Sequence, residues 1–181
     1  MKIRTSFVGN SSSSSFIVKF PKIPKTAKEL QKMLFGNNKI NKPYDDAFET
    51  LELAECVFKD MKAQKDKIEY YSYPNKKMSV NEIIMDLLIN SWEVGKEVDR
   101  IFGKDYFEIH KDGRSPEEIK KDEQECAMIE KQVANRVYND FMKKDGRVYI
   151  FHYGDDDGPF YCVLEHGGTF NRLEHLRISH H

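Results

Sequence analysis

The side chains best suited to chemistry in this sequence are histidines and aspartates gathered in residues 147–181. Three consecutive aspartates stand at 155–157, within a turn-like Gly-Asp-Asp-Asp-Gly-Pro segment. Five of the six histidines of the chain lie in the same stretch: His152, His166, His175, His180 and His181. Zinc takes neutral imidazole and carboxylate ligands in proteins, with three protein ligands and one open position in catalytic sites. This stretch therefore predicts either a site for a divalent metal such as zinc or a hydrogen-bonded polar cluster.

Strand geometry limits which of these residues can share a metal ion. Adjacent side chains on a strand point to opposite faces, so His180 and His181 are not expected to bind one ion together. Their spacings match no zinc motif, and the aspartates also fit the polar tip of a hairpin. A histidine cluster without metal therefore stays open beside the metal site, whose candidate ligands are His166, His175, His180 and Asp155.

A run of five serines near the other end of the chain is the second unusual feature. The run comprises Ser11, Ser12, Ser13, Ser14 and Ser15, and it lies between Phe7-Val8 and Phe16-Ile17-Val18. Serine runs are typical of flexible linkers, but here β-forming residues resume at once on the far side. We therefore expect an ordered segment whose hydroxyl and amide groups line a surface or pocket. Such groups bind anions where the backbone forms a nest of N–H donors, and serines are also targets for phosphorylation.

The composition describes a chain that can bury one substantial core. The 181 residues are 39% hydrophobic, and 29 basic residues nearly balance 30 acidic ones. A formal net charge of -1 gives no strong nucleic-acid signal, because such proteins usually show a basic excess. No apolar run approaches the ~18 residues of a membrane span. The widely spaced Cys56, Cys126 and Cys162 indicate buried thiols in a reducing cytoplasm, so we expect a cytoplasmic protein.

Apolar periodicity and capping patterns predict four helices, at residues 26–35, 44–64, 79–101 and 115–143. The third carries the most apolar stripe and is expected to be the central helix. Residues 148–153 and 160–164 are β-rich runs on either side of the Gly-Asp-Asp-Asp-Gly-Pro turn, a pattern that predicts a hairpin. The core is expected to include Leu51, Phe58, Leu87, Leu88, Cys126, Ile129 and Val133.

The order strand, helices, strands predicts an α+β fold. We expect a single domain over residues 1–181, in which helices pack on a small, mostly antiparallel sheet that includes both terminal regions. Its parts are a serine-rich strand segment at 1–20, a helical middle at 26–143 and a histidine-rich hairpin at 147–181.

Both ends of the chain carry short patterns. The N-terminal pattern is Phe7-Val8, Asn10, the five serines and Phe16, and the other is Leu164-Glu165-His166-Gly167 with Ile178-Ser179-His180-His181. These patterns resemble the ends of uncharacterised bacterial and phage proteins, although Gly9 stands where a serine is expected. The resemblance leaves the helical middle uncovered. It implies a family of unknown activity, frequent in phages and mobile elements, and it assigns no catalytic residue.

Two classes of function fit these observations. One is an accessory protein of the phage or mobile-element type, located in the host cytoplasm. It would bind a host or viral protein, or a small anionic ligand, through a polar site built from the serines, His166, His175 and His180. The other is a small metal-dependent hydrolase that uses the histidine and aspartate cluster. A serine nucleophile beside His166 or His175 is a further alternative, but five equivalent hydroxyls are poorly suited to placing one precise nucleophile.

Overall fold

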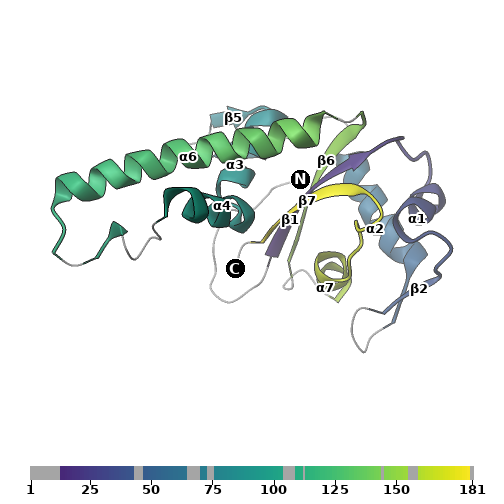
Figure 1. The fold of residues 1–181 in the computed structure, drawn as a ribbon. Helices are drawn as coiled ribbons and strands as arrows, with labels where there is room; N and C mark the ends of the chain where they lie inside the picture. Colours follow the sequence, from purple (N-terminus) through teal and green to yellow (C-terminus); the bar gives the residue numbers. More distant parts are fainter. Residues whose placement is uncertain are drawn as a thin grey trace. The chain divides into compact units, whose positions relative to one another are not determined.

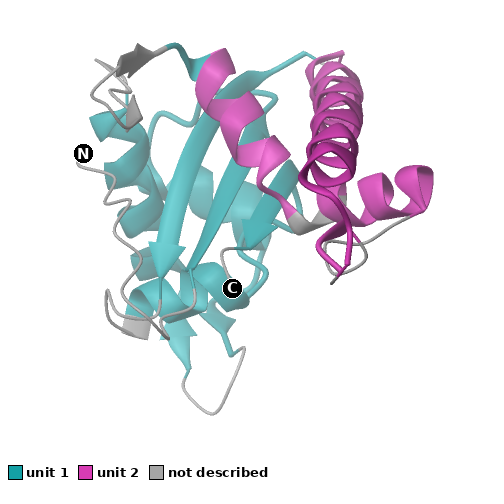
Figure 2. Ribbon diagram, turned by 90° about the vertical axis from the view of Figure 1, so that its left-hand side faces the viewer, with its two compact units in different colours: residues 1–80, 145–181 teal, residues 81–144 magenta. Residues whose placement is uncertain are grey.

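The structure is a computed structural model, and it describes residues 13–42, 47–64, 70–72, 76–103, 109–111, 113–143, 145–154 and 159–179. The chain divides into two compact units, residues 1–80 with 145–181 and residues 81–144 (Figure 2). The predicted α+β class is confirmed, because helices pack on a small antiparallel sheet that includes strands from both terminal regions (Figure 1). The organisation of residues 1–181 as one domain stays a prediction.

The main sheet has three strands, and the first strand of the chain lies in its middle. Strand β1 (Ser13–Phe20) pairs antiparallel with β6 (Arg147–Gly154) on one side and with β7 (Glu174–Ser179) on the other. In this register Ser14 lies opposite Tyr153 and Ser179. Residues directly opposite one another share a face of the sheet. The sheet therefore brings the serine run beside strands from the histidine-rich region.

The core of the larger unit is built on one face of this sheet. Helices α1 (Ala27–Phe35), α2 (Thr50–Ala63) and α7 (Pro159–His166) contribute leucines, valines and a methionine to it. The strands contribute mainly aromatic rings, which pack on Phe170 from the turn before β7. Its ring centroid lies 5.1 Å from that of Phe16 and 5.0 Å from that of Phe151. Large rings at these separations account for much of the buried area. The aromatic residues of the core are Phe16, Phe20, Phe35, Tyr149, Phe151, Tyr153 and Phe170.

Local signals explain where α1 begins and ends. The Thr26 hydroxyl accepts a hydrogen bond from the Glu29 amide at 3.2 Å, which satisfies a donor at the start of the helix. Gly36 ends the helix with a φ of 65°, a conformation that favours glycine. Two short ribbons complete this part of the fold: β2 (Ile40–Asn41) pairs with β3 (Phe48–Glu49), and β4 (Tyr70–Ser72) pairs with β5 (Lys76–Met78).

Helical structure in the middle of the chain differs from prediction at one internal break. The single helix predicted over 79–101 is wrong, because α3 (Val80–Ile89) and α4 (Trp92–Phe102) are separate helices. Ser91 lies between them; its hydroxyl donates to the Leu88 carbonyl at 2.8 Å and accepts from the Val94 amide at 3.2 Å. A serine that bonds the backbone in this way competes with the continuous helix.

Helix α6 (Pro116–Met142) follows its sequence signals more closely. Ser115 and Glu118 form the predicted capping box, with Pro116 in the first turn. The Asp122 carboxylate, which interrupts the apolar stripe, is buried and accepts a hydrogen bond from Arg114 at 2.7 Å. Pairing explains why a buried position holds an acid.

The predicted hairpin over residues 147–181 is also wrong. Residues 160–164 belong to helix α7, and β6 and β7 both pair with β1, so this region is a strand, a helix and a strand. The apolar run contains Phe160, Val163 and Leu164, whose spacing fits one face of a helix as well as it fits a strand. Helix α2 likewise begins at Thr50 instead of residue 44, because residues 48–49 form β3.

Part of the predicted core is confirmed. Leu87, Leu88 and Val133 are buried, whereas Leu51, Phe58, Cys126 and Ile129 are only partly buried. On α2 the buried apolar residues are Leu53, Ala54, Val57 and Met61. The buried face of this helix therefore excludes Leu51 and Phe58, which were expected in the core.

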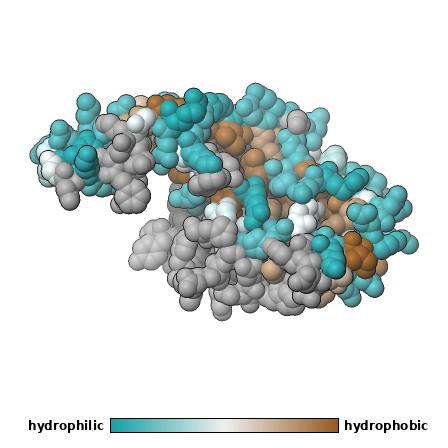
Figure 3. Space-filling model, turned by 60° about the horizontal axis from the view of Figure 1, so that its bottom comes forward, coloured by the Kyte–Doolittle hydropathy of each residue, from teal (hydrophilic) through white to brown (hydrophobic). Residues whose placement is uncertain are grey.

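The visible surface is largely hydrophilic. On the face shown in Figure 3, hydrophobic residues are interspersed among hydrophilic ones. Among the residues that the structure describes, the exposed large hydrophobic ones are Ile23, Ile40, Ile101, Met128 and Met142. Within the part of the chain that the structure describes, no helix has the length and apolar content needed to cross a membrane.

Candidate functional site

The structure places the predicted site residues on three elements. Ser13, Ser14 and Ser15 begin strand β1, as expected for an ordered serine segment. His166 is the last residue of α7, and His175 lies in β7. Four further candidates lie outside the described residues: Ser11, Ser12, Asp155 and His180.

A connected polar group, here called the Arg177 cluster, is formed by Ser14, Glu165, His166 and Arg177. The Ser14 hydroxyl donates to Glu165 Oε1 at 2.9 Å and accepts from Arg177 Nε and Nη2 at 3.2 and 3.1 Å. Arg177 Nη2 lies 3.5 Å from His166 Nδ1, and His166 Nε2 lies 3.5 Å from Glu165 Oε2. The serine run and the histidine-rich region therefore meet in this cluster, because Glu165 and Arg177 each contact both Ser14 and His166.

Two residues of the cluster are buried and the other two are partly exposed. Ser14 is 0% exposed and Glu165 is 1% exposed, whereas the side chains of His166 and Arg177 are 22% and 39% exposed. A buried carboxylate is tolerated where it is paired and hydrogen-bonded. Glu165 meets both conditions, because Ser14 donates to it and Arg177 Nη2 lies 4.0 Å from its Oε1.

Arg177 is held in one orientation from two sides. The Ser14 hydroxyl binds two of its nitrogens, and its guanidinium carbon lies 5.7 Å from the centre of the Phe16 ring, a cation–π separation. Among the described residues, none forms a hydrogen bond with Arg177 Nη1. A guanidinium fixed in this way presents its remaining N–H donors without further loss of side-chain entropy.

The other histidines of the region have different surroundings. His175 Nδ1 lies 3.1 Å from the Leu173 carbonyl oxygen, and the ring centroids of Phe16 and Phe170 both lie 6.4 Å from that of His175. His152 Nδ1 lies 3.1 Å from the Ser15 hydroxyl. Side chains alternate along a strand, so Ser15 and His152 lie on the face of the sheet opposite to Ser14. The serines thus serve two separate polar contacts.

Metal binding stays a prediction. Searching the described residues finds no group of three or more histidine, cysteine, aspartate or glutamate side chains that could hold an ion. Two ligands of the predicted set, His180 and Asp155, lie outside those residues. The two described ligands, His166 and His175, contact different neighbours, the Arg177 cluster and two aromatic rings.

The hydroxyl of Ser14 is arranged for support and not for attack. A serine nucleophile needs an adjacent base that takes its proton, but Ser14 Oγ donates to a buried carboxylate while accepting from arginine. Ser15 does contact an imidazole, that of His152, yet Ser15 is 3% exposed. A substrate carbonyl therefore has little access to either oxygen.

A second polar contact, partly buried, joins β6 to α2. The Tyr153 hydroxyl donates to Asp60 Oδ2 at 3.2 Å. Burial is the main cause that raises the pKa of Tyr153 well above its ordinary value, and the nearby Asp60 carboxylate adds to it. Burial also raises the pKa of Asp60, and the hydrogen bond from Tyr153 lowers it in part. A buried phenol thus donates one hydrogen bond to a desolvated acid.

Sequence reasoning missed the two residues that connect the cluster, Glu165 and Arg177. Alternation within Glu-His-Leu-Arg-Ile-Ser places Arg177 on the same strand face as His175, and this signal was present. Glu165 is adjacent to His166, but only the position of α7 against β1 shows that its carboxylate meets Ser14.

Comparisons with protein-family models, with curated proteins and with solved structures found no match to this chain. A function can therefore be proposed only from the contacts described above.

Proposed function

We propose that this chain is a cytoplasmic binding protein, of the phage or mobile-element accessory type, that holds an anionic group of its partner with Arg177 and His166. The observation that carries the proposal is the fixed guanidinium of Arg177, which is 39% exposed and keeps Nη1 without a hydrogen bond among the described residues. The partner is a host or viral protein, or a small anionic ligand.

The chemistry of the cluster favours an anion over other ligands. A guanidinium offers parallel N–H donors that match the oxygens of a carboxylate or phosphate. His166 stands 3.5 Å from Arg177 Nη2, so one ligand oxygen can lie near both side chains.

Ser14 and Glu165 have a supporting role in this proposal. Both are buried, and together they hold the guanidinium and the imidazole at the surface. Glu165 also offsets part of the charge of Arg177, which favours reversible capture of a partner over tight retention of any anion in solution.

The test uses inorganic phosphate and a phosphorylated serine peptide as probes, with amide NMR shifts as the measure of binding. Arg177→Gln is expected to weaken binding about tenfold or more, because a charge-assisted hydrogen bond contributes roughly 1.5–3 kcal/mol. Arg177→Lys, which keeps the charge without the planar fork, should recover only part of the affinity.

Arg172→Gln is the matched control, since Arg172 is an exposed arginine five residues from Arg177. Unfolding curves for each variant separate lost binding from lost structure. Equal affinities of Arg177→Gln and Arg172→Gln for both probes would contradict the proposal, as would the absence of shifts at residues 165–177 in the unsubstituted protein.

A further inference from the structure

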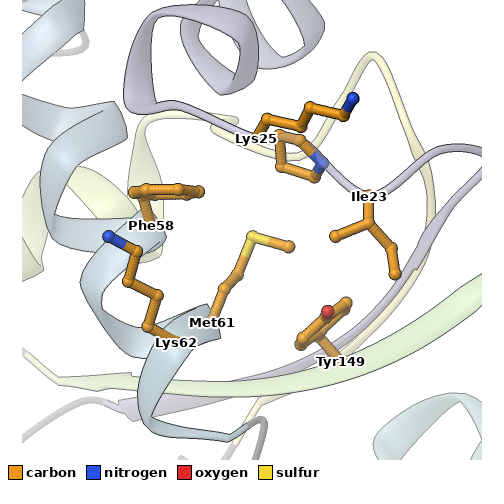
Figure 4. Close-up of a pocket in the computed structure, with 7 residues that line it drawn as sticks. Ile23, Lys25, Phe58, Met61, Lys62 and Tyr149 are labelled. Atoms are coloured by element: carbon orange, nitrogen blue, oxygen red, sulfur yellow. The ribbon is translucent and has the colours of Figure 1, made fainter.

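A separate pocket lies at the other end of strand β1 from Ser14. It is lined by the segment after β1, the last two turns of α2 and one residue of β6, and its volume is about 370 Å³ (Figure 4). Tyr149 of β6 pairs with Val18, four residues along β1 from Ser14. At about 3.4 Å per residue the pocket and the Arg177 cluster are some 14 Å apart along the strand. The lining residues are Ile23, Pro24, Lys25, Phe58, Met61, Lys62 and Tyr149.

The inside of the pocket is apolar and rich in rings. Figure 4 shows the Met61 side chain between Phe58 and Tyr149. Met61 and Tyr149 are each 3% exposed, and both belong to the core of the larger unit. Aromatic rings and a thioether sulfur together form a favourable environment for a flat aromatic group.

The rim of the pocket carries charge of one sign. Lys25 and Lys62 are its only charged lining residues among those that the structure describes, and both are exposed. The Lys62 ammonium lies 4.4 Å from the centre of the Phe58 ring, which holds it beside the opening. The nearby Glu29 carboxylate is already engaged by the Lys22 ammonium at 2.6 Å and the Lys25 backbone amide at 2.9 Å.

We propose that this pocket binds a small aromatic carboxylate, with its ring against Met61, Phe58 and Tyr149 and its carboxylate beside Lys62 or Lys25. The apolar interior accounts for the ring, and the two lysines account for a negative group at the opening. A volume of about 370 Å³ matches small-molecule sites, which span roughly 300–1,000 Å³. This inference does not depend on the function proposed for the Arg177 cluster.

The experiment follows methionine methyl groups by NMR during titration with 1-naphthaleneacetate. The Met61 methyl, assigned by Met61→Leu, should shift and saturate. Met128 and Met142, exposed and outside the pocket, should not move and serve as internal references. The neutral 1-naphthaleneacetamide and the cation 2-(1-naphthyl)ethylamine test the charge requirement with the same ring.

The carboxylate is expected to bind about two- to fivefold more tightly than the amide, the range for an ion pair exposed to solvent. Lys62→Gln combined with Lys25→Gln should remove this preference while leaving amide binding unchanged. Lys59→Gln, an exposed lysine on the same helix outside the pocket lining, is the control and should preserve it.

Three outcomes would overturn the proposal: no shift of Met61, equal binding of amide and carboxylate, or stronger binding of the amine. A further outcome is that the carboxylate fails while an acidic peptide with a central phenylalanine shifts Met61. The pocket would then be a docking site for a protein side chain, and the small-molecule proposal would be wrong.

Discussion

Ser14 and Phe16, neighbours on one face of strand β1, are buried alike but stabilised differently. Ser14 is 0% exposed and Phe16 is 4% exposed, and both side chains lie on the same face of the sheet. Phe16 packs against the rings of Phe170 and Tyr153. Ser14 instead makes hydrogen bonds to Glu165 and Arg177. The depth of burial of a residue therefore does not show whether hydrogen bonds or apolar packing stabilise it.

The two positions are also expected to respond differently to small structural changes. An aromatic core tolerates modest shifts of its rings, because dispersion and hydrophobic terms are spread over many contacts. A buried hydrogen-bonded group has few partners, and the loss of one leaves another without compensation. We expect substitutions at Ser14 to be strongly coupled to its partners, and those at Phe16 to depend mainly on volume.

The largest effect is expected from Phe16→Ala, which removes a ring from the centre of the aromatic core. The free energy of unfolding should fall by about 3–5 kcal/mol, the usual range for a buried phenylalanine. Urea titration followed by circular dichroism measures it. Phe16→Leu, which keeps most of the apolar volume, should lose clearly less. A loss below about 1 kcal/mol for the alanine variant would remove Phe16 from the core.

An intermediate effect is expected from Ser14→Ala, which takes one hydrogen bond from buried Glu165 and two from Arg177. The free energy of unfolding should fall by about 1–3 kcal/mol. A double-mutant cycle with Glu165→Gln measures the coupling, which should exceed about 0.5 kcal/mol for groups in one network. Additive effects of the two substitutions would show that the cluster is not a single unit.

The smallest effect is expected from Asp60→Asn, which keeps an oxygen to accept from the Tyr153 hydroxyl. Burial raises the pKa of Asp60 above its ordinary value of 3.8, so the folded state binds this proton more tightly than the unfolded state. The ionised carboxylate therefore lowers stability as pH rises from below 3.8 through the raised pKa. Asparagine removes this penalty.

Asp60→Asn should accordingly match the parent protein in acid and be slightly more stable at neutral pH. Urea midpoints at about pH 3 and pH 7 give the comparison. If the variant were instead less stable at pH 7 and equal in acid, the Asp60 carboxylate would stabilise the fold through its contact with Tyr153, and the sign of the pKa shift would be wrong.

Local signals in the sequence predicted element boundaries where side chains act on their own backbone. The cap at Thr26 and the capping box at Ser115 are of this kind, and the structure confirms both. Ser91 also acts locally, but it lies within an apolar stripe that suits a continuous helix, so its capping role was overlooked. The apolar run at 160–164 was assigned to a strand because four or five residues cannot distinguish the two periods.

The candidate site depends on relations that no local pattern contains. Ser14 and Glu165 are 151 residues apart in sequence, and their contact requires both the register of β1 and the helical state of residues 159–166. The proximity of the serine run and His166 was predicted only from the unusual composition of both stretches. Arg177 has an unremarkable sequence context, so its role emerges only from three-dimensional contacts.

The central place of β1 in its sheet has a consequence for how the chain folds. Both neighbours of β1 come from residues 147–179, so Ser15 meets His152 only by closing a loop of 137 residues. The chain loses the entropy of closing this long loop before the strand contacts contribute any stabilisation. During synthesis the apolar segment Phe16–Phe20 stays without its strand partners until β6 and β7 have been made. We therefore expect slow, late formation of this sheet, and a need for chaperone protection of β1 in the meantime.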